Sequence, residues 1–126
     1  MTASHSILLV ESDTECGQAL ARLLRRNGHR VRLVRSARTA TTAADKESFD
    51  LAIVDLLVPG GGADLGRRLS ASVPRLYLSI GAHLLPEEII EVALGFPVLR
   101  KSALPGLLGA SGNGNGGNGT GNGRKR

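Results

Sequence analysis

The stretch FDLAIVDLLVP, residues 49–59, decides the fold. Residues 51–54 form an unbroken apolar run, which is typical of a strand covered on both faces and predicts a central strand of a parallel sheet. The run stops at Asp55, and Pro59 with the three glycines after it takes the chain out of the sheet. We therefore expect a carboxylate at the C-terminal end of a central strand, where open α/β sheets bind ligands. A lone aspartate more often only stops a strand or caps a helix, so the interpretation of Asp55 depends on its companions.

Length and composition predict one ordinary folded domain. The chain has 126 residues, of which 41% are hydrophobic and 21% charged. It shows no apolar run long enough to cross a bilayer and no secretory leader, which predicts a cytoplasmic protein. The single cysteine, Cys16, excludes an internal disulfide, argues against a zinc or redox site, and is expected to be a small buried residue. Without tryptophan and with three other aromatic residues, a stacking platform for single-stranded nucleic acid is not expected.

The net charge of +5 is unevenly distributed along the chain. Three basic residues end the chain, and the rest carries 13 basic against 11 acidic side chains. Seven arginines lie between Glu15 and Asp45 with no acid among them: Arg22, Arg25, Arg26, Arg30, Arg32, Arg35 and Arg38. Such a face could meet an acidic partner or a phosphate backbone, but charge runs usually solvate a surface, and we favour that second interpretation. The arginines at 30 and 32 alternate with apolar residues, as in a protected edge strand.

Strand and helix patterns alternate along the chain. The predicted strands are residues 7–10, 30–34, 48–54, 76–80 and 97–100, and the predicted helices are 15–27, 36–46, 64–71 and 86–95. The inward helix positions are expected to be Cys16, Ala19, Leu20, Leu23 and Leu24 in the first helix and Ile89, Ile90 and Ala93 in the last. Alternation of this kind predicts a parallel sheet with right-handed crossovers and helices on both faces.

The C-terminal part of the chain does not predict further folded structure. Proline and glycine interrupt the few leucines between residues 104 and 109, so a fifth helix should be shortened or missing. Residues 111–126, SGNGNGGNGTGNGRKR, are expected to form a disordered tail behind a domain of residues 1–110. Its basic end, Arg124, Lys125 and Arg126, could touch nucleic acid or an anionic surface, but three charges bind weakly alone.

Polar residues collect at the predicted C-terminal strand ends. They are Glu11, Asp13, Asp55, Ser79 and Lys101. Parallel strands bring these ends to one rim, where two or three carboxylates would suit Mg²⁺. A lysine and a hydroxyl opposite would stabilise a transferred phosphoryl group. Each residue alone also has a structural interpretation, such as an ion pair, but their joint placement favours a functional site.

Four pieces of the sequence together resemble the receiver domains of bacterial two-component response regulators. These pieces are ILLVESD at 7–13, DLAIVDLLVP at 50–59, LYLS at 76–79 and VLRKS at 98–102. Their order and spacing are far more specific than any single one. The resemblance implies a flavodoxin-like, doubly wound sheet of five parallel strands in the order 2-1-3-4-5.

The resemblance also implies a role for each site residue. Asp55 would be the aspartate phosphorylated by a histidine kinase or phosphotransfer protein, and Ser79 the hydroxyl that rotates toward the phosphoryl group. Lys101 would contact the acceptor, while the backbone carbonyl of Leu57 would join the acids as a ligand of Mg²⁺. The domain would signal to a downstream partner protein and would not be an enzyme.

Departures from the family pattern fall on metal binding and signal transmission. Ser12 stands where the family has a second acid, and Asp13, one residue further, could replace it only if the loop rearranges. Val98 stands at the position of an aromatic switch residue, and Ser102 at that of a proline. Mg²⁺ should therefore bind weakly. Two functions compete: a phosphorylatable receiver, or a degenerate pseudo-receiver that binds partners without phosphorylation.

Two classes of enzyme are not expected. Phosphatases and mutases with an aspartyl nucleophile at such a strand end normally carry a second aspartate two residues on, where this chain has Leu57. Metal-dependent nucleic-acid enzymes likewise need an Asp-x-Asp pair, which is absent at this position.

Overall fold

The computed structural model describes residues 4–81 and 86–104 of the chain. Within them, five parallel strands form one sheet in the order β2-β1-β3-β4-β5. The strands are β1 (Ser6–Val10), β2 (Arg30–Val34), β3 (Leu51–Asp55), β4 (Arg75–Ile80) and β5 (Val98–Arg100). The predicted doubly wound, flavodoxin-like topology is confirmed.

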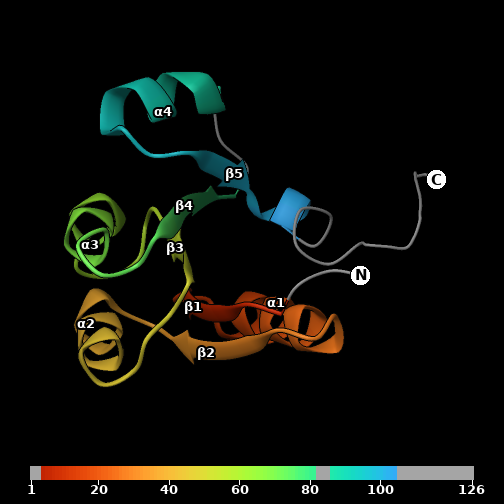
Figure 1. Cartoon of the computed structure of the whole chain (residues 1–126). Coiled ribbons are helices and arrows are strands. Elements are labelled where there is room, and N and C mark those ends of the chain that lie inside the picture. The colour runs from red at the N-terminus through yellow and green to blue at the C-terminus, as the bar shows by residue number, and fades with distance from the viewer. Residues whose placement is uncertain (1–3, 82–85, 105–126) are drawn as a thin grey trace.

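Four α-helices connect the strands. They are α1 (Thr14–Arg26), α2 (Ala37–Lys46), α3 (Gly62–Leu69) and α4 (Glu87–Leu94), and a short 3₁₀ turn, Lys101–Ala103, follows β5. Helices α2 and α3 cover one face of the sheet, α1 covers the other, and α4 lies beside β5 at the sheet edge (Figure 1). None of these helices is long and apolar enough to cross a membrane. The expected loss of a fifth helix and the expected tail fall on residues 105–126, outside the described residues.

Side chains and a glycine cap the helix ends. Asp13 caps α1, its carboxylate accepting the Cys16 N–H at 2.8 Å, and Ser36 opens α2 with a complete capping box. Gly95 ends α4 at a φ of 79°, a left-handed conformation that favours glycine. The joints between strands and helices are therefore short and well defined, which aligns the strand ends on one rim.

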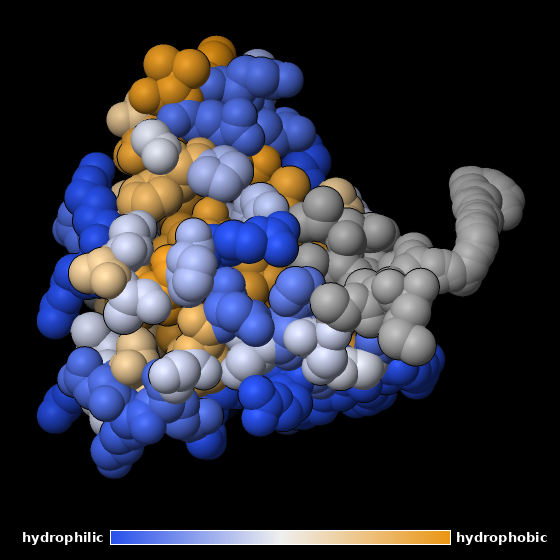
Figure 2. All heavy atoms as spheres, viewed as in Figure 1, coloured by the Kyte–Doolittle hydropathy of each residue, from blue (hydrophilic) through white to orange (hydrophobic). Residues whose placement is uncertain are grey.

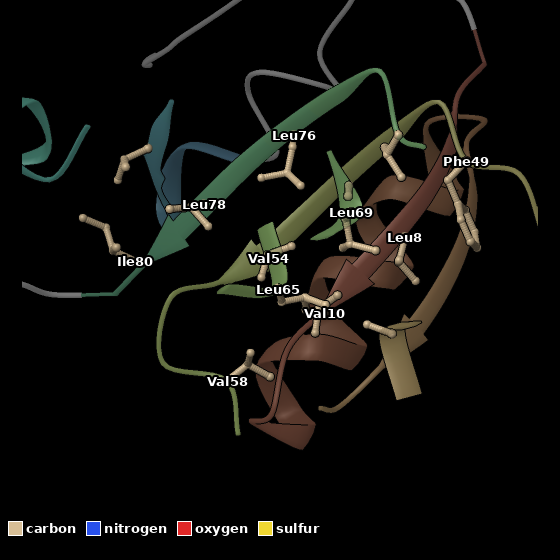
Figure 3. Packing of buried hydrophobic residues seen from close by; sticks show 14 of the residues in the cluster. Leu8, Val10, Phe49, Val54, Val58, Leu65, Leu69, Leu76, Leu78 and Ile80 are labelled. Carbon is tan, nitrogen blue, oxygen red and sulfur yellow. The ribbon is translucent and has the colours of Figure 1, made fainter. Parts of the chain in front are cut away.

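The core is aliphatic and lies on both faces of the sheet. Every residue of β3 is buried, as the run at 51–54 predicted. On the face of α2 and α3, Val54 and Leu78 pack against Leu65 and Leu69 of α3 (Figure 3). Full burial of each such side chain contributes about 1.5–3 kcal/mol, so this core can hold polar groups rigidly at the strand ends.

The predicted inward faces of two helices are partly wrong. Ala19 in α1 and Ala93 in α4 are exposed, and Ile89 is 53% exposed, so Ile90 is the one fully buried residue of α4. Helix α4 packs beside the edge strand β5 rather than over the middle of the sheet, and its buried stripe is correspondingly narrow. Cys16 is half-buried, and its thiol hydrogen-bonds to Glu11 instead of packing only against apolar atoms.

Candidate functional site

The rim formed by the C-terminal strand ends carries four of the predicted site residues. Glu11 follows β1, Asp55 ends β3, Ser79 lies in β4, and Lys101 follows β5. Strand register places Ser79 directly beside Asp55. Glu11, Asp55 and Ser79 expose only 1%, 5% and 2% of their surfaces. Buried polar groups of this kind need partners, because an unpaired buried charge is very costly.

Lys101 is the partner of both buried carboxylates. Its Nζ lies 2.8 Å from Oε1 of Glu11 and 3.5 Å from Oδ2 of Asp55. Burial lowers the pKa of the Lys101 ammonium, but the hydrogen bond to Glu11 and the charges of Asp55 and Glu11 outweigh it and raise the pKa above its usual value. The ammonium is therefore charged at neutral pH, and the three groups carry one net negative charge.

Backbone and thiol donors fix the remaining carboxylate oxygens. Oδ1 of Asp55 accepts the Leu57 N–H at 3.2 Å, which leaves Oδ2 facing Lys101. Oε2 of Glu11 accepts the Asp13 N–H at 3.0 Å. The Cys16 thiol donates to Oε1 of Glu11 at 3.8 Å, and burial together with the Glu11 charge raises the pKa of this thiol. Cys16 is therefore a protonated neighbour of the site.

The three predicted acids do not converge. Asp13 is exposed and its carboxylate caps α1, while Ser12, partly buried, contributes no charge. In the described part of the chain, no group of three or more His, Cys, Asp or Glu side chains could hold a metal ion. Mg²⁺ needs only one or two carboxylates when phosphoryl oxygens and water complete its shell. The oxygens of Asp55, Glu11 and the Leu57 carbonyl are chemically suited to that role.

A second set of polar contacts, which the sequence did not single out, joins α4 to β5. Arg100 pairs with Glu87 at 2.8 Å and donates to the Gly81 carbonyl at 3.2 Å. Glu91 accepts the Val98 N–H at 2.9 Å. Glu87 and Glu91 are four residues apart and therefore lie on the same face of a helix. This spacing was the sequence feature that could have indicated the contacts between α4 and β5. Val98, at the expected switch position, is buried.

Comparisons with known proteins agree with this fold. No family model matches the chain. The sensory transduction protein RegX3 of Mycobacterium tuberculosis is 35% identical over 77 residues, which are 59% of this chain and 34% of RegX3. The match thus spans about a third of that curated relative.

Solved structures of receiver domains superpose on most of the chain. A putative response regulator from Chloroflexus aurantiacus shows a TM-score of 0.71 and 25% identity, covering 84% of this chain and 92% of that one. The BeF3-activated receiver domain of Klebsiella pneumoniae RstA gives a TM-score of 0.71 at 24% identity, covering 82% and 91%. The CheY-like receiver of Methanospirillum hungatei gives 0.69 at 21%, covering 86% and 88%.

The fold is flavodoxin-like, and its rim carries two buried acids and a lysine. The chain is similar to the response regulator receiver domains of two-component signalling over most of its described length.

Proposed function

We propose that this receiver accepts a phosphoryl group on Asp55 from a histidine kinase or phosphotransfer protein and thereby changes its contacts with a partner protein. The observation that carries the proposal is the geometry of Asp55. Its Oδ2 faces the Lys101 ammonium at 3.5 Å, and its strand neighbour is Ser79. A nucleophilic oxygen, a cation and a hydroxyl are the parts that phosphoryl transfer to a carboxylate requires.

Each residue has a defined part in the transfer. The P–N bond of the donor phosphohistidine breaks as a P–O bond forms to Oδ2 of Asp55, and the departing imidazole nitrogen keeps the electron pair and takes up a proton. Lys101 stabilises the charge on the phosphoryl oxygens, because its raised pKa keeps it protonated. Ser79 donates its hydroxyl to one of these oxygens. Glu11 positions Lys101 through their 2.8 Å contact.

Mg²⁺ is the proposed cofactor, and it should bind weakly. Asp55, Glu11 and the Leu57 carbonyl would hold it, and it would supply further positive charge to the phosphoryl oxygens. Ser12 contributes no charge to this binding, and the ammonium of Lys101 competes for both buried carboxylates. Both features weaken the attraction for a divalent cation.

Mass spectrometry after incubation with acetyl phosphate and Mg²⁺ tests the proposal. We expect the intact mass to rise by one phosphoryl group, and the modified peptide to contain Asp55. Asp55→Asn should abolish the adduct, while Asp64→Asn, an exposed acid on α3, should leave it unchanged. Absence of an adduct, both with acetyl phosphate and with a phosphorylated histidine donor, would overturn the proposal.

A degenerate pseudo-receiver is the second candidate. It is favoured by the neutral Ser12 and by the ion pair that already joins Lys101 to Glu11. In that case the rim is a structural network, and the surface binds its partner without phosphorylation. We further propose that in either case the domain acts in the cytoplasm as a binding module without catalytic turnover.

A further inference from the structure

Seven exposed arginines surround one edge of the sheet. They are the arginines between positions 22 and 38, and we call them the arginine face. Three come from the C-terminal half of α1, two from the edge strand β2, one from the loop before α2, and one from the first turn of α2. Figure 2 shows mainly blue and white residues around β2, whereas orange, hydrophobic residues gather over α4. Val31 and Leu33 pack with the cluster beneath α1, so the alternating Arg30 and Arg32 point to the opposite side of the sheet, and the arginine face bends around the β2 edge.

The charge of the arginine face is left largely uncompensated. Arg25 donates to the Val31 carbonyl at 2.8 Å, and Arg35 donates to the Thr14 hydroxyl. Both acceptors are neutral. Arg32 pairs with Glu47, and this is the one ion pair of the arginine face within the described residues.

Of the four other arginines in the described residues, two pair with acids and two, Arg68 and Arg75, do not. Arg67 pairs with Asp64 at 2.7 Å, and Arg100 pairs with Glu87 at 2.8 Å. No acid lies between residues 16 and 44. The positive potential is therefore concentrated on α1 and β2, where it would attract a polyanion.

The chemistry of the arginine face favours a nucleic-acid backbone over a protein. Specific protein interfaces are organised around buried aromatic or aliphatic anchors. Among the described residues, the exposed large hydrophobics are Leu57, Ile89 and Val92, none of which lies on the arginine face. Arg25 occupies the outward Val31 carbonyl of β2, which obstructs the addition of a partner strand at that edge.

We propose that the arginine face binds duplex nucleic acid through its phosphates, without reading the base sequence. Arginine matches phosphate geometry with paired N–H donors, and the scarcity of aromatic residues argues against stacking of single-stranded bases. Binding of this kind has dissociation constants of about 10⁻⁴ to 10⁻⁶ M and falls steeply with salt. It requires neither phosphorylation of Asp55 nor a metal ion.

The test is fluorescence anisotropy with a labelled DNA duplex of random sequence, titrated at several salt concentrations. The test variant is Arg22→Gln/Arg26→Gln/Arg30→Gln, because these three arginines make no ion pair in the described structure and should be replaceable without unfolding it. The matched control, Arg67→Gln/Arg68→Gln/Arg75→Gln, removes the same charge from α3 and the start of β4. A third variant neutralises Arg124, Lys125 and Arg126. Thermal melting verifies that each variant is folded.

We expect the test variant to bind the duplex at least tenfold more weakly at low salt. Its slope of log K against log salt should be smaller by roughly two to three, since each lost phosphate contact reduces the slope by about 0.9. The control should change affinity less than threefold. Equal losses in test and control, or a loss confined to the tail variant, would overturn the proposal. Tighter binding of the same face to a polyglutamate peptide or to phosphatidylserine vesicles would overturn the choice of nucleic acid.

Discussion

Lys101 is the residue on which the buried charges of the rim depend. Removing it leaves Glu11 and Asp55 without their cation in an environment where an uncompensated charge is costly. We expect Lys101→Met to lower the free energy of unfolding by about 3 kcal/mol, measured by urea denaturation at pH 7. Lys46→Met, at an exposed position in the last turn of α2, is the control and should stay within about 0.5 kcal/mol.

A second substitution checks the cause of that loss. Adding Glu11→Gln to Lys101→Met should restore part of the lost stability, because it removes one of the two orphaned charges. If Lys101→Met is no more harmful than Lys46→Met, the acids are not held by this ion pair.

The same contacts give stability a defined pH dependence. The pKa of Lys101 is raised in the folded protein, so its contribution is fully present below the lysine pKa of the unfolded chain, about 10.4. It is lost as the pH rises through the higher folded value. We expect the stability difference between wild type and Lys101→Met to be constant from pH 7 to pH 9 and to shrink above about pH 10.5. Urea denaturation across this range measures it, and a constant difference up to pH 12 would contradict it.

We expect the neutral Ser12 to limit the affinity of the proposed Mg²⁺ site. Ser12→Asp should tighten Mg²⁺ binding by on the order of tenfold or more, because one added carboxylate near the cation is worth more than about 1 kcal/mol even with solvent screening. Isothermal titration calorimetry measures the Mg²⁺ affinity of wild type, Ser12→Asp and the uncharged control Ser12→Asn. Comparison of the two variants separates the effect of side-chain charge from that of side-chain size. Equal affinity in all three would show that other oxygens already supply the missing ligand.

At the scale of elements, the sequence predicted the strands better than the faces of the helices. The run at 51–54, with turn residues after it, favours a strand buried on both faces. Asp55 directly follows this run and is therefore expected at the C-terminal strand end. The exposure of the Ile89 side chain was not predictable in this way, because it depends on whether α4 covers the middle of the sheet or its edge. That depends on tertiary packing beside β5, which local periodicity does not contain.

The Arg100–Glu87 ion pair should contribute modestly to the attachment of α4 to β5. A double-mutant cycle of Arg100→Gln and Glu87→Gln should give a coupling of about 0.5 kcal/mol, a small value because both side chains are 35% exposed. The coupling should fall in 1 M salt, and amide exchange in α4 should accelerate in both single variants. The exposed Arg67–Asp64 pair within α3 is the control, for which exchange in α4 should not change. Zero coupling at low salt would mean that apolar packing of Ile90 holds the helix.

For the whole molecule, the sequence predicted the topology of the sheet and the residues at its rim. It did not predict which ion pairs and hydrogen bonds these residues form. Glu11, Asp55, Ser79 and Lys101 meet because parallel strands end at one edge, and this follows from their positions after apolar runs. The use of Asp13 as a helix cap instead of a metal ligand depends on the φ and ψ angles of one loop residue. Sequence spacing does not determine such angles, and the expected acid cluster is therefore reduced to two carboxylates around Lys101.

The last prediction concerns residues 111–126, whose composition sets them apart from the domain. They contain no apolar side chain, so they cannot bury enough surface to offset the entropy of ordering, which is on the order of 1–2 kcal/mol per residue. Deleting them should leave the melting temperature of the domain unchanged.

As a flexible chain they would extend on the order of 20 Å. Their three terminal charges would then add avidity to a salt-sensitive contact made by the arginine face. We expect the truncated protein to bind duplex DNA several-fold more weakly at low salt, with the difference vanishing at high salt. A fall of several degrees in melting temperature would instead show that these residues pack against the fold and that the domain extends beyond residue 110.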